Sequence, residues 1–191
     1  MSNKKWLVPL IAIVAVVALI GGIFGGYYNS FVSKQQAVDS QWAQVENQYQ
    51  RRYDLIPNLV AAVKGVLKQE QKVFGDIAEA RKGYAGALTT EEKVAAANQM
   101  ESALSRLLVI VENYPQLKSN ENVRDLMVQL EGTENRISVE RRRYNEEVRS
   151  YNTAVKRFPG VVLAGIFGFE ERSYFESAAS AKRAPKVDLG Q

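Results

Sequence analysis

The sequence contains no cysteine and no histidine. Without cysteine there are no disulfide bonds and no thiolate nucleophiles. Without either residue type there are no Cys or His zinc sites, no histidine-ligated haem, and no Ser/His/Asp or Cys/His triad. Composition therefore excludes much of known enzyme chemistry. We assign no catalytic residue, expect no cofactor, and predict that the protein is not an enzyme.

The chain also lacks a large excess of positive or negative residues. Lys and Arg number 25 against 21 Asp and Glu, which gives a net charge of +4. This excess is too small to indicate a nucleic-acid partner. The triple basic run at 141–143 is flanked by Glu140, Glu146 and Glu147, and its spacing to the last two suits surface ion pairs along a helix. We expect no nucleic-acid binding.

Charge is absent altogether between Trp6 and Ser33, and Leu7–Phe24 is apolar apart from Pro9 and two glycines. At about 1.5 Å per residue such a helix covers close to the roughly 30 Å of a bilayer's hydrocarbon. No two small residues are separated by a single position, as a signal-peptide cleavage site requires. Residues 1–31 are therefore predicted to be an uncleaved transmembrane anchor.

The anchor has two further features. Ala18, Gly22 and Gly26 are spaced by four, so they share a helix face that lets another helix approach closely and predicts a homo-oligomer. The alternative is that small residues are simply common in spanning helices. Lys4 and Lys5 precede the apolar run and only Lys34 follows it closely, which predicts a cytoplasmic N-terminus and a bundle outside the cytoplasm.

Beyond the anchor, prolines are few and no long stretch alternates apolar with polar residues, so strands are not indicated. Apolar residues instead recur every three or four positions, which predicts helices. Pro57 either starts a new helix or kinks a continuing one, and Thr90 is the expected N-cap of the third helix. The predicted fold is all-α, a transmembrane helix followed by an up-and-down four-helix bundle over 32–157. The first helix is predicted at about 29–55, and the apolar stripe of the second runs from Val60 to Tyr84. The third is predicted from Thr90 to Tyr114 and the fourth from Val123 to Phe158.

Some charged residues fall on the apolar stripes of these helices, where they have to be paired or desolvated. We expect a buried polar layer in which Glu134 or Glu112 meets Arg81 or Arg141. The alternative turns Thr133 inward and Glu134 outward. Metal sites of helical bundles use Glu-x-x-His pairs, which this chain lacks. Binding of a hard cation by carboxylates alone is left open, and we assign no metal ligand.

After the bundle, residues 158–181 begin with an almost wholly apolar stretch, 158–169, which is too short to span a bilayer. It is predicted either to cap the open end of the bundle or to contact the membrane or a partner. Residues 182–191 are polar and are expected to form a flexible tail. The residues assigned to membrane or partner contact are Val161, Val162, Leu163, Ile166 and Phe167.

Several ordered segments resemble motifs of the LemA family. They are RRYDLIPNLV at 51–60 with VKG at 63–65, ENYPQLK at 112–118, TENRI at 133–137, the Tyr-Asn repeats at 144–145 and 151–152, and an ending with Phe158, Pro159, Gly168, Phe169, Phe175 and Glu176. The resemblance covers about 27–176. It implies a membrane-anchored, all-helical bacterial protein without an established catalytic activity.

Together these observations predict a single-pass protein of the bacterial inner membrane that acts as an envelope scaffold or interaction protein. The expected partners are the lipid membrane, further copies of the chain, and unknown envelope proteins. The alternative is an enzyme or enzyme subunit with a carboxylate-based metal site in the bundle.

Overall fold

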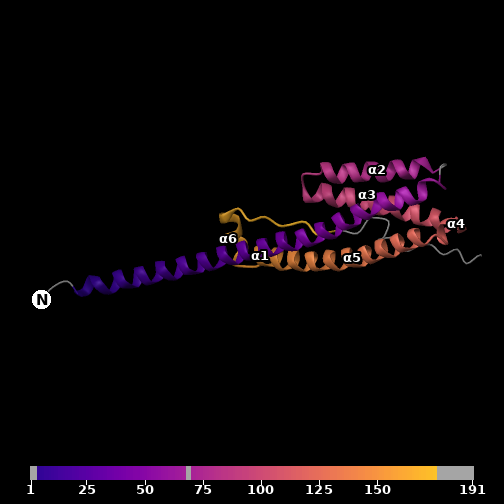
Figure 1. Ribbon diagram of the computed structural model, residues 1–191. Coiled ribbons are helices and arrows are strands. Elements are labelled where there is room, and N and C mark those ends of the chain that lie inside the picture. Colours follow the sequence, from indigo (N-terminus) through magenta and orange to yellow (C-terminus); the bar gives the residue numbers. More distant parts are fainter. Residues whose placement is uncertain (1–3, 68–69, 176–191) are drawn as a thin grey trace, which may run out of the picture. The chain divides into compact units, whose positions relative to one another are not determined.

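The computed structural model describes residues 4–67 and 70–175, and all regular structure in these ranges is helical. The prediction of an all-α protein is confirmed at this level. The predicted features at 176–181 and in the tail at 182–191 lie outside the described residues. The helices are α1 (Lys4–Lys64), α2 (Gln71–Gly86), α3 (Thr90–Glu112), α4 (Pro115–Lys118), α5 (Glu121–Lys156) and α6 (Gly160–Phe167) (Figure 1).

These helices contribute to two compact units. The described residues of Met1–Trp42 and Arg143–Ser173 form unit 1, and those of Ala43–Arg142 and Tyr174–Gln191 form unit 2. Helices α1 and α5 each run through both units. The predicted division into anchor, bundle and cap stays a prediction. The four-helix up-and-down topology stays a prediction.

Helix α1 is continuous from the apolar N-terminal run to Lys64, with Pro57 in its interior. Of the two alternatives for Pro57, the continuing helix is therefore the one observed, and the predicted end of a helix near residue 55 is wrong. A proline inside a helix costs about 3 kcal/mol because one backbone hydrogen bond is lost. Burial of a single apolar stripe on both sides of Pro57 offsets this cost. The buried positions follow a spacing of three, four or seven: Val38, Val45, Tyr49, Arg52, Ile56, Leu59 and Val63.

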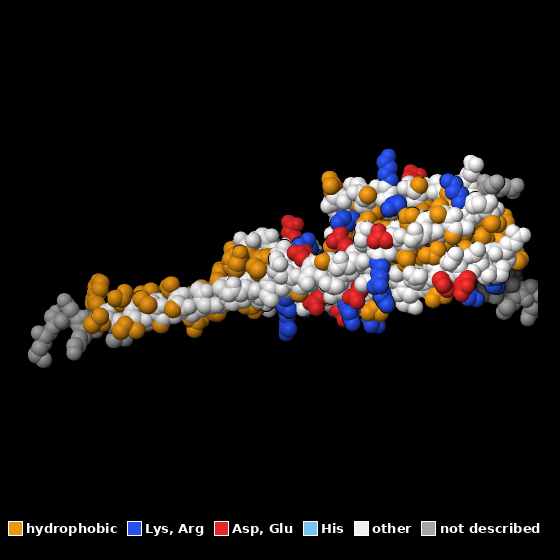
Figure 2. Space-filling view, in the orientation of Figure 1, with side chains coloured by type: hydrophobic (Ala, Val, Ile, Leu, Met, Phe, Trp, Pro, Cys, Tyr) orange, Lys and Arg blue, Asp and Glu red, His pale blue; other side chains and the backbone are white. Residues whose placement is uncertain are grey.

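The N-terminal part of α1 is long and apolar enough to cross a membrane by length and composition, and its apolar window is unburied within the protein. Figure 2 shows hydrophobic side chains along this part of the helix, whereas charged side chains are spread over the rest of the visible face. The finding agrees with a membrane anchor.

In unit 1, α5 runs antiparallel to α1. Lys34 Nζ donates to Ser150 Oγ at 2.7 Å, and the rings of Trp42 and Tyr144 meet edge to face with centroids 5.4 Å apart. Helix α6 then packs closely behind the end of α5. A Cβ atom on Gly160 would clash with the carbonyl oxygen of Ala154, so only glycine permits this approach.

The chain after α6 returns along α5 and is held by side chains of that helix. Tyr151 donates its hydroxyl hydrogen to the carbonyl oxygen of Glu170 at 2.8 Å. Asn152 exchanges two hydrogen bonds with the backbone of Arg172, both 2.9 Å long, and the Tyr144 hydroxyl donates to the Ser173 carbonyl. Three side chains within the Tyr-Asn repeats therefore fasten the return segment.

In unit 2, α2 and α3 form a helical hairpin (Figure 1). Its turn is fixed by a capping box in which Thr89 Oγ1 accepts from the amide of Glu92, and the Glu92 carboxylate accepts from the amide of Thr89. The N-cap is thus Thr89, one residue before the predicted Thr90, because Thr89 has the extended backbone that a capping side chain requires. The short helix α4, with Pro115 in its first turn, was not predicted.

Candidate functional site

A polar layer lies inside unit 2 and is centred on Arg52 of α1. The Arg52 side chain is 5% exposed and forms an ion pair with Glu134 of α5. Its Nε donates to Thr133 Oγ1 at 3.4 Å, and that hydroxyl donates to the carbonyl oxygen of Leu130 at 2.7 Å. Burial lowers the pKa of Arg52 from its usual value, an effect that Glu101 and Tyr49 oppose. The ion pair and the hydroxyl thus accommodate a charge at a position otherwise occupied by apolar residues.

A second part of the layer is centred on Arg141 of α5. Its Nε donates to the Tyr49 hydroxyl at 2.9 Å, and its Nη2 donates to Glu101 Oε2 at 2.9 Å. The guanidinium carbon lies 4.3 Å from the ring centroid of Phe175, within the range of a cation–π contact. Burial raises the pKa of the Tyr49 hydroxyl despite the nearby Arg141, so this phenol stays neutral at physiological pH.

The composition of the layer differs from the predicted one. Arg81 and Glu112 are exposed and take no part in it, because their side chains point away from the stripes that α2 and α3 bury. Glu134 pairs with Arg52 instead of Arg81 or Arg141, and Arg141 pairs with Glu101. Thr133 is buried and Glu134 is partly exposed, so elements of both alternatives are present. The described residues contain no group of three or more His, Cys, Asp or Glu placed to hold a metal ion.

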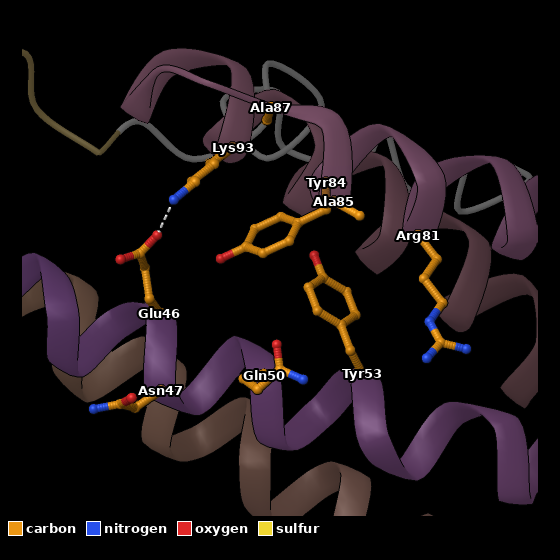
Figure 3. Close-up of a pocket in the computed structure, with 9 residues that line it drawn as sticks. All are labelled: Glu46, Asn47, Gln50, Tyr53, Arg81, Tyr84, Ala85, Ala87 and Lys93. Atoms are coloured by element: carbon orange, nitrogen blue, oxygen red, sulfur yellow. Dashed lines mark hydrogen bonds and ion pairs between the residues drawn. The ribbon is translucent and has the colours of Figure 1, made fainter.

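Beside this layer is an open pocket of about 540 Å³ between α1, α2 and the start of α3. Figure 3 shows Tyr53 extending from α1 and Tyr84 from α2 into the pocket, with Arg81 at one end and the Lys93–Glu46 ion pair at the other. The two tyrosine rings touch, with centroids 4.6 Å apart. Both hydroxyl oxygens are buried and have no hydrogen-bond partner within the part of the chain that the structure describes.

The surface next to the apolar run of α1 belongs to unit 1 and is aromatic. Phe167 at the end of α6 meets Phe24 and Tyr28 of α1, with ring centroids 6.1 Å and 5.2 Å apart. Phe169 meets Tyr28 and Phe31 in the same way, at 5.8 Å and 5.2 Å. These five rings, which we call the aromatic collar, attach α6 to the C-terminal end of the apolar run. Figure 2 shows hydrophobic side chains gathered over the same region.

The five residues assigned to membrane or partner contact divide into two groups on α6. Val161, Val162 and Ile166 are exposed, at 49%, 55% and 61%. Leu163 is buried within unit 1, and Phe167 is half-buried in the aromatic collar. Neither side chain is therefore fully available for contact with a membrane or a partner. Helical geometry explains the division, because positions 163 and 167 share one face and 162 and 166 share another. On the anchor, Ala18, Gly22 and Gly26 are all exposed.

Sequence reasoning missed three of the main residues: Arg52, Tyr53 and Tyr84 in their polar roles. A signal for Arg52 is present, since 45, 49, 52, 56 and 59 alternate by four and three and place residue 52 on the buried stripe. No comparable signal marks the two tyrosines. Aromatic residues on a stripe are expected in a core, and only the packing of α1 against α2 leaves their hydroxyl groups unpaired.

Comparison with known proteins finds relatives over most of the chain. Residues 41–189 match the sequence model of the LemA family. The magnetosome protein MamQ of Magnetospirillum gryphiswaldense is 27% identical over 195 residues, which cover 88% of this chain and 71% of the relative. Magnetosome protein MamQ 2 of Paramagnetospirillum magneticum is 26% identical over 193 residues, with 87% and 71% covered.

Proposed function

The chain belongs to the LemA family, and we propose that it is a membrane-anchored interaction protein whose bundle is held against the bilayer surface by α6. The observation that carries the proposal is the packing of Phe167 on Phe24 and Tyr28. Through this contact α6 adjoins the last turns of the helix segment that is apolar enough to span.

The depth of α6 follows from the length of the apolar run. About 20 residues are needed to cross the hydrocarbon, so a span that begins at Leu7 extends to about residue 26. Phe24 then lies inside the hydrocarbon boundary, and Tyr27 and Tyr28 lie where aromatic side chains prefer the membrane interface. A helix attached to these residues has its exposed apolar face at headgroup depth, where such a face is stabilised by lipid.

The anchor supports a scaffold role through self-association. Its Ala18, Gly22 and Gly26 face is open, and a Cβ added to Gly22 or Gly26 would meet no atom within 4 Å. Close approach of a second copy at this face is favoured by van der Waals packing. We place the protein in the bacterial inner membrane with the bundle outside the cytoplasm, as the lysines around the span indicate, and we assign it no catalytic activity.

The test is to measure the membrane depth of α6 in the full chain. The protein lacks cysteine, so Val162→Cys, Ile166→Cys and controls each introduce a single site for a nitroxide spin label. In lipid nanodiscs, electron paramagnetic resonance then compares collisions with oxygen, which concentrates in lipid, against those with a water-soluble nickel chelate. We expect labels at 162 and 166 to collide more often with oxygen than with the nickel chelate.

Two labels calibrate the measurement. Val16→Cys reports the centre of the predicted span, and Thr153→Cys reports an exposed site on α5 in unit 1. If the labels at 162 and 166 collide with oxygen and the nickel chelate in the same ratio as the label in Thr153→Cys, the apolar face of α6 lies in water. This outcome would contradict the proposal and leave the anchor itself intact.

A further inference from the structure

The open pocket that holds Tyr53 and Tyr84 adjoins a second cavity at Arg81. An apolar groove of about 610 Å³ between α1 and α2 shares Arg81 and Ala85 with it. The floor of the groove includes Ile56, Phe74 and Ile77, of which the first and last belong to the core. Each cavity has the size of sites that hold small molecules, about 300–1,000 Å³. The two cavities adjoin at Arg81 and Ala85, and we refer to them together as the recess, with the pocket as its polar end and the groove as its apolar end.

The polar end offers donors that lack acceptors. Tyr53 is 4% exposed, and its hydroxyl, like that of Tyr84, is buried without a partner among the described residues. Burial raises the pKa of both phenols well above the usual 10. Both therefore keep their protons at neutral pH and donate. A buried donor without an acceptor costs about 1–3 kcal/mol, so a ligand that supplies an acceptor oxygen here is favoured.

Charge around the recess is positive. Lys64, Arg81 and Lys82 line the groove, and none of its lining residues is acidic. In the pocket the single carboxylate, Glu46, is paired with Lys93. Arg81 forms no ion pair with any residue that the structure describes. It lines both cavities, and Figure 3 shows it at one end of the pocket that holds the tyrosines.

We propose that this recess binds a small amphipathic carboxylate. Its carboxylate group lies at Arg81, on the side of the Tyr53 hydroxyl, and its aliphatic chain lies in the groove. Arg81 supplies the opposite charge, and the Tyr53 phenol, whose ring touches that of Tyr84, supplies a hydrogen bond. Ile56, Phe74 and Ile77 remove the apolar chain from water. The proposal goes beyond membrane attachment and does not depend on the placement of α6.

Hexanoate is the probe, and the full chain in lipid nanodiscs is the sample. Carbon-13 labels on the tyrosine rings report binding at each site by NMR, with Tyr53→Phe and Tyr84→Phe used to assign the two resonances. We expect saturable shifts at Tyr53 and Tyr84. Tyr27 and Tyr28, next to the predicted span, report any partition of hexanoate into the lipid, and Tyr151 reports on unit 1.

Three comparisons test the chemistry of the site. Hexanamide keeps the chain and loses the charge, and Arg81→Gln keeps the fold because Arg81 is exposed. Each is expected to weaken binding by about fivefold, as for a partly solvated ion pair. Butyrate lacks two methylene groups and is expected to bind about tenfold more weakly. Lys72→Gln, an exposed cation of α2 outside both cavities, should leave binding unchanged.

The outcomes separate clearly. The proposal is supported if the shifts saturate, are confined to Tyr53 and Tyr84, and show weaker binding both for hexanamide and in Arg81→Gln. It is overturned by shifts that never saturate, by shifts shared equally with Tyr27, Tyr28 and Tyr151, or by equal binding of hexanamide. Unchanged affinity in Arg81→Gln overturns it as well, and a circular dichroism spectrum shows that this variant is folded.

Discussion

Arg52 of α1 and Thr133 of α5 face each other at core positions of their helices, joined by a 3.4 Å hydrogen bond from Nε to Oγ1. Both residues are 4% exposed. Glu134, the next residue of α5, neutralises the guanidinium from the edge of the layer, where its side chain is 40% exposed. A buried cation is thereby held by one hydroxyl and one partly solvated carboxylate, and removal of the Glu134 charge takes away its only direct ion pair among the described residues.

Glu134→Gln tests this arrangement. The variant keeps the shape of the side chain but removes the charge, and we expect the free energy of unfolding to fall by about 1–3 kcal/mol because Arg52 stays buried without its ion-pair partner. Denaturant melts of the full chain in mild detergent measure the change. Glu146→Gln, at an exposed site of α5, should cost less than about 0.5 kcal/mol. Equal effects would mean that Arg52 finds another partner.

The buried phenols predict loss of stability in alkali. Tyr53 faces Tyr84, Tyr49, Arg52 and Arg141, and burial is the largest cause of its raised pKa. A pKa raised in the folded state means that the contribution to stability is complete below the unfolded pKa of about 10. That contribution is lost as the pH rises from about 10 toward the higher folded pKa. Melts across this window should show a steep decline.

Tyr84→Phe is the matched variant for the alkaline decline, since burial, together with the nearby Glu46 and Tyr49, also raises the pKa of Tyr84. Removal of one titrating phenol should make the decline shallower, because fewer protons are released on unfolding. Tyr174→Phe, at an exposed tyrosine, should leave it unchanged. An identical decline in wild type and Tyr84→Phe would show that this hydroxyl ionises in the folded protein as it does in water.

Two glycines of α6 form a matched pair. Gly160→Ala places a methyl group against the Ala154 carbonyl oxygen, whereas Gly165→Ala meets no atom within 4 Å. We expect the first to destabilise the protein by about 1–3 kcal/mol, as overpacking does. The second should be neutral or slightly stabilising. Thermal melts of both variants decide this, and a neutral Gly160→Ala would mean that α6 shifts freely on unit 1.

Gly22→Ile tests self-association through the anchor. The larger side chain keeps helices apart at the proposed contact face but meets nothing within its own chain, so oligomer mass in mild detergent should fall while helical circular dichroism stays the same. Val17→Ile, on another face of the same helix, should leave the mass unchanged. A monomeric wild type would remove the self-assembly hypothesis, and an unchanged mass in Gly22→Ile would remove the anchor from the interface.

Sequence alone determined the features that depend on local periodicity. The uncharged run from Trp6 to Ser33 and the stripes that recur every three or four residues predicted an apolar anchor and an all-helical chain. The anchor follows from the length and composition of one continuous run. The helices follow from which residues share one face, and helical geometry fixes that without knowledge of neighbours. The Tyr-Asn repeats also formed part of the resemblance to the LemA family. The sequence did not reveal that three of their side chains hold the segment that follows α6.

Tertiary structure decided what the stripes contact. Pro57 lies within α1 because burial on both sides of it outweighs the lost hydrogen bond, and local rules for proline contain no term for that burial. Arg81 and Arg141 were equivalent in the sequence as cations on a stripe. Packing placed Arg141 between Tyr49, Glu101 and Phe175 and left Arg81 exposed beside two unpaired phenols. Which polar groups find partners depends on contacts between helices far apart in the chain, and these form only when the core closes.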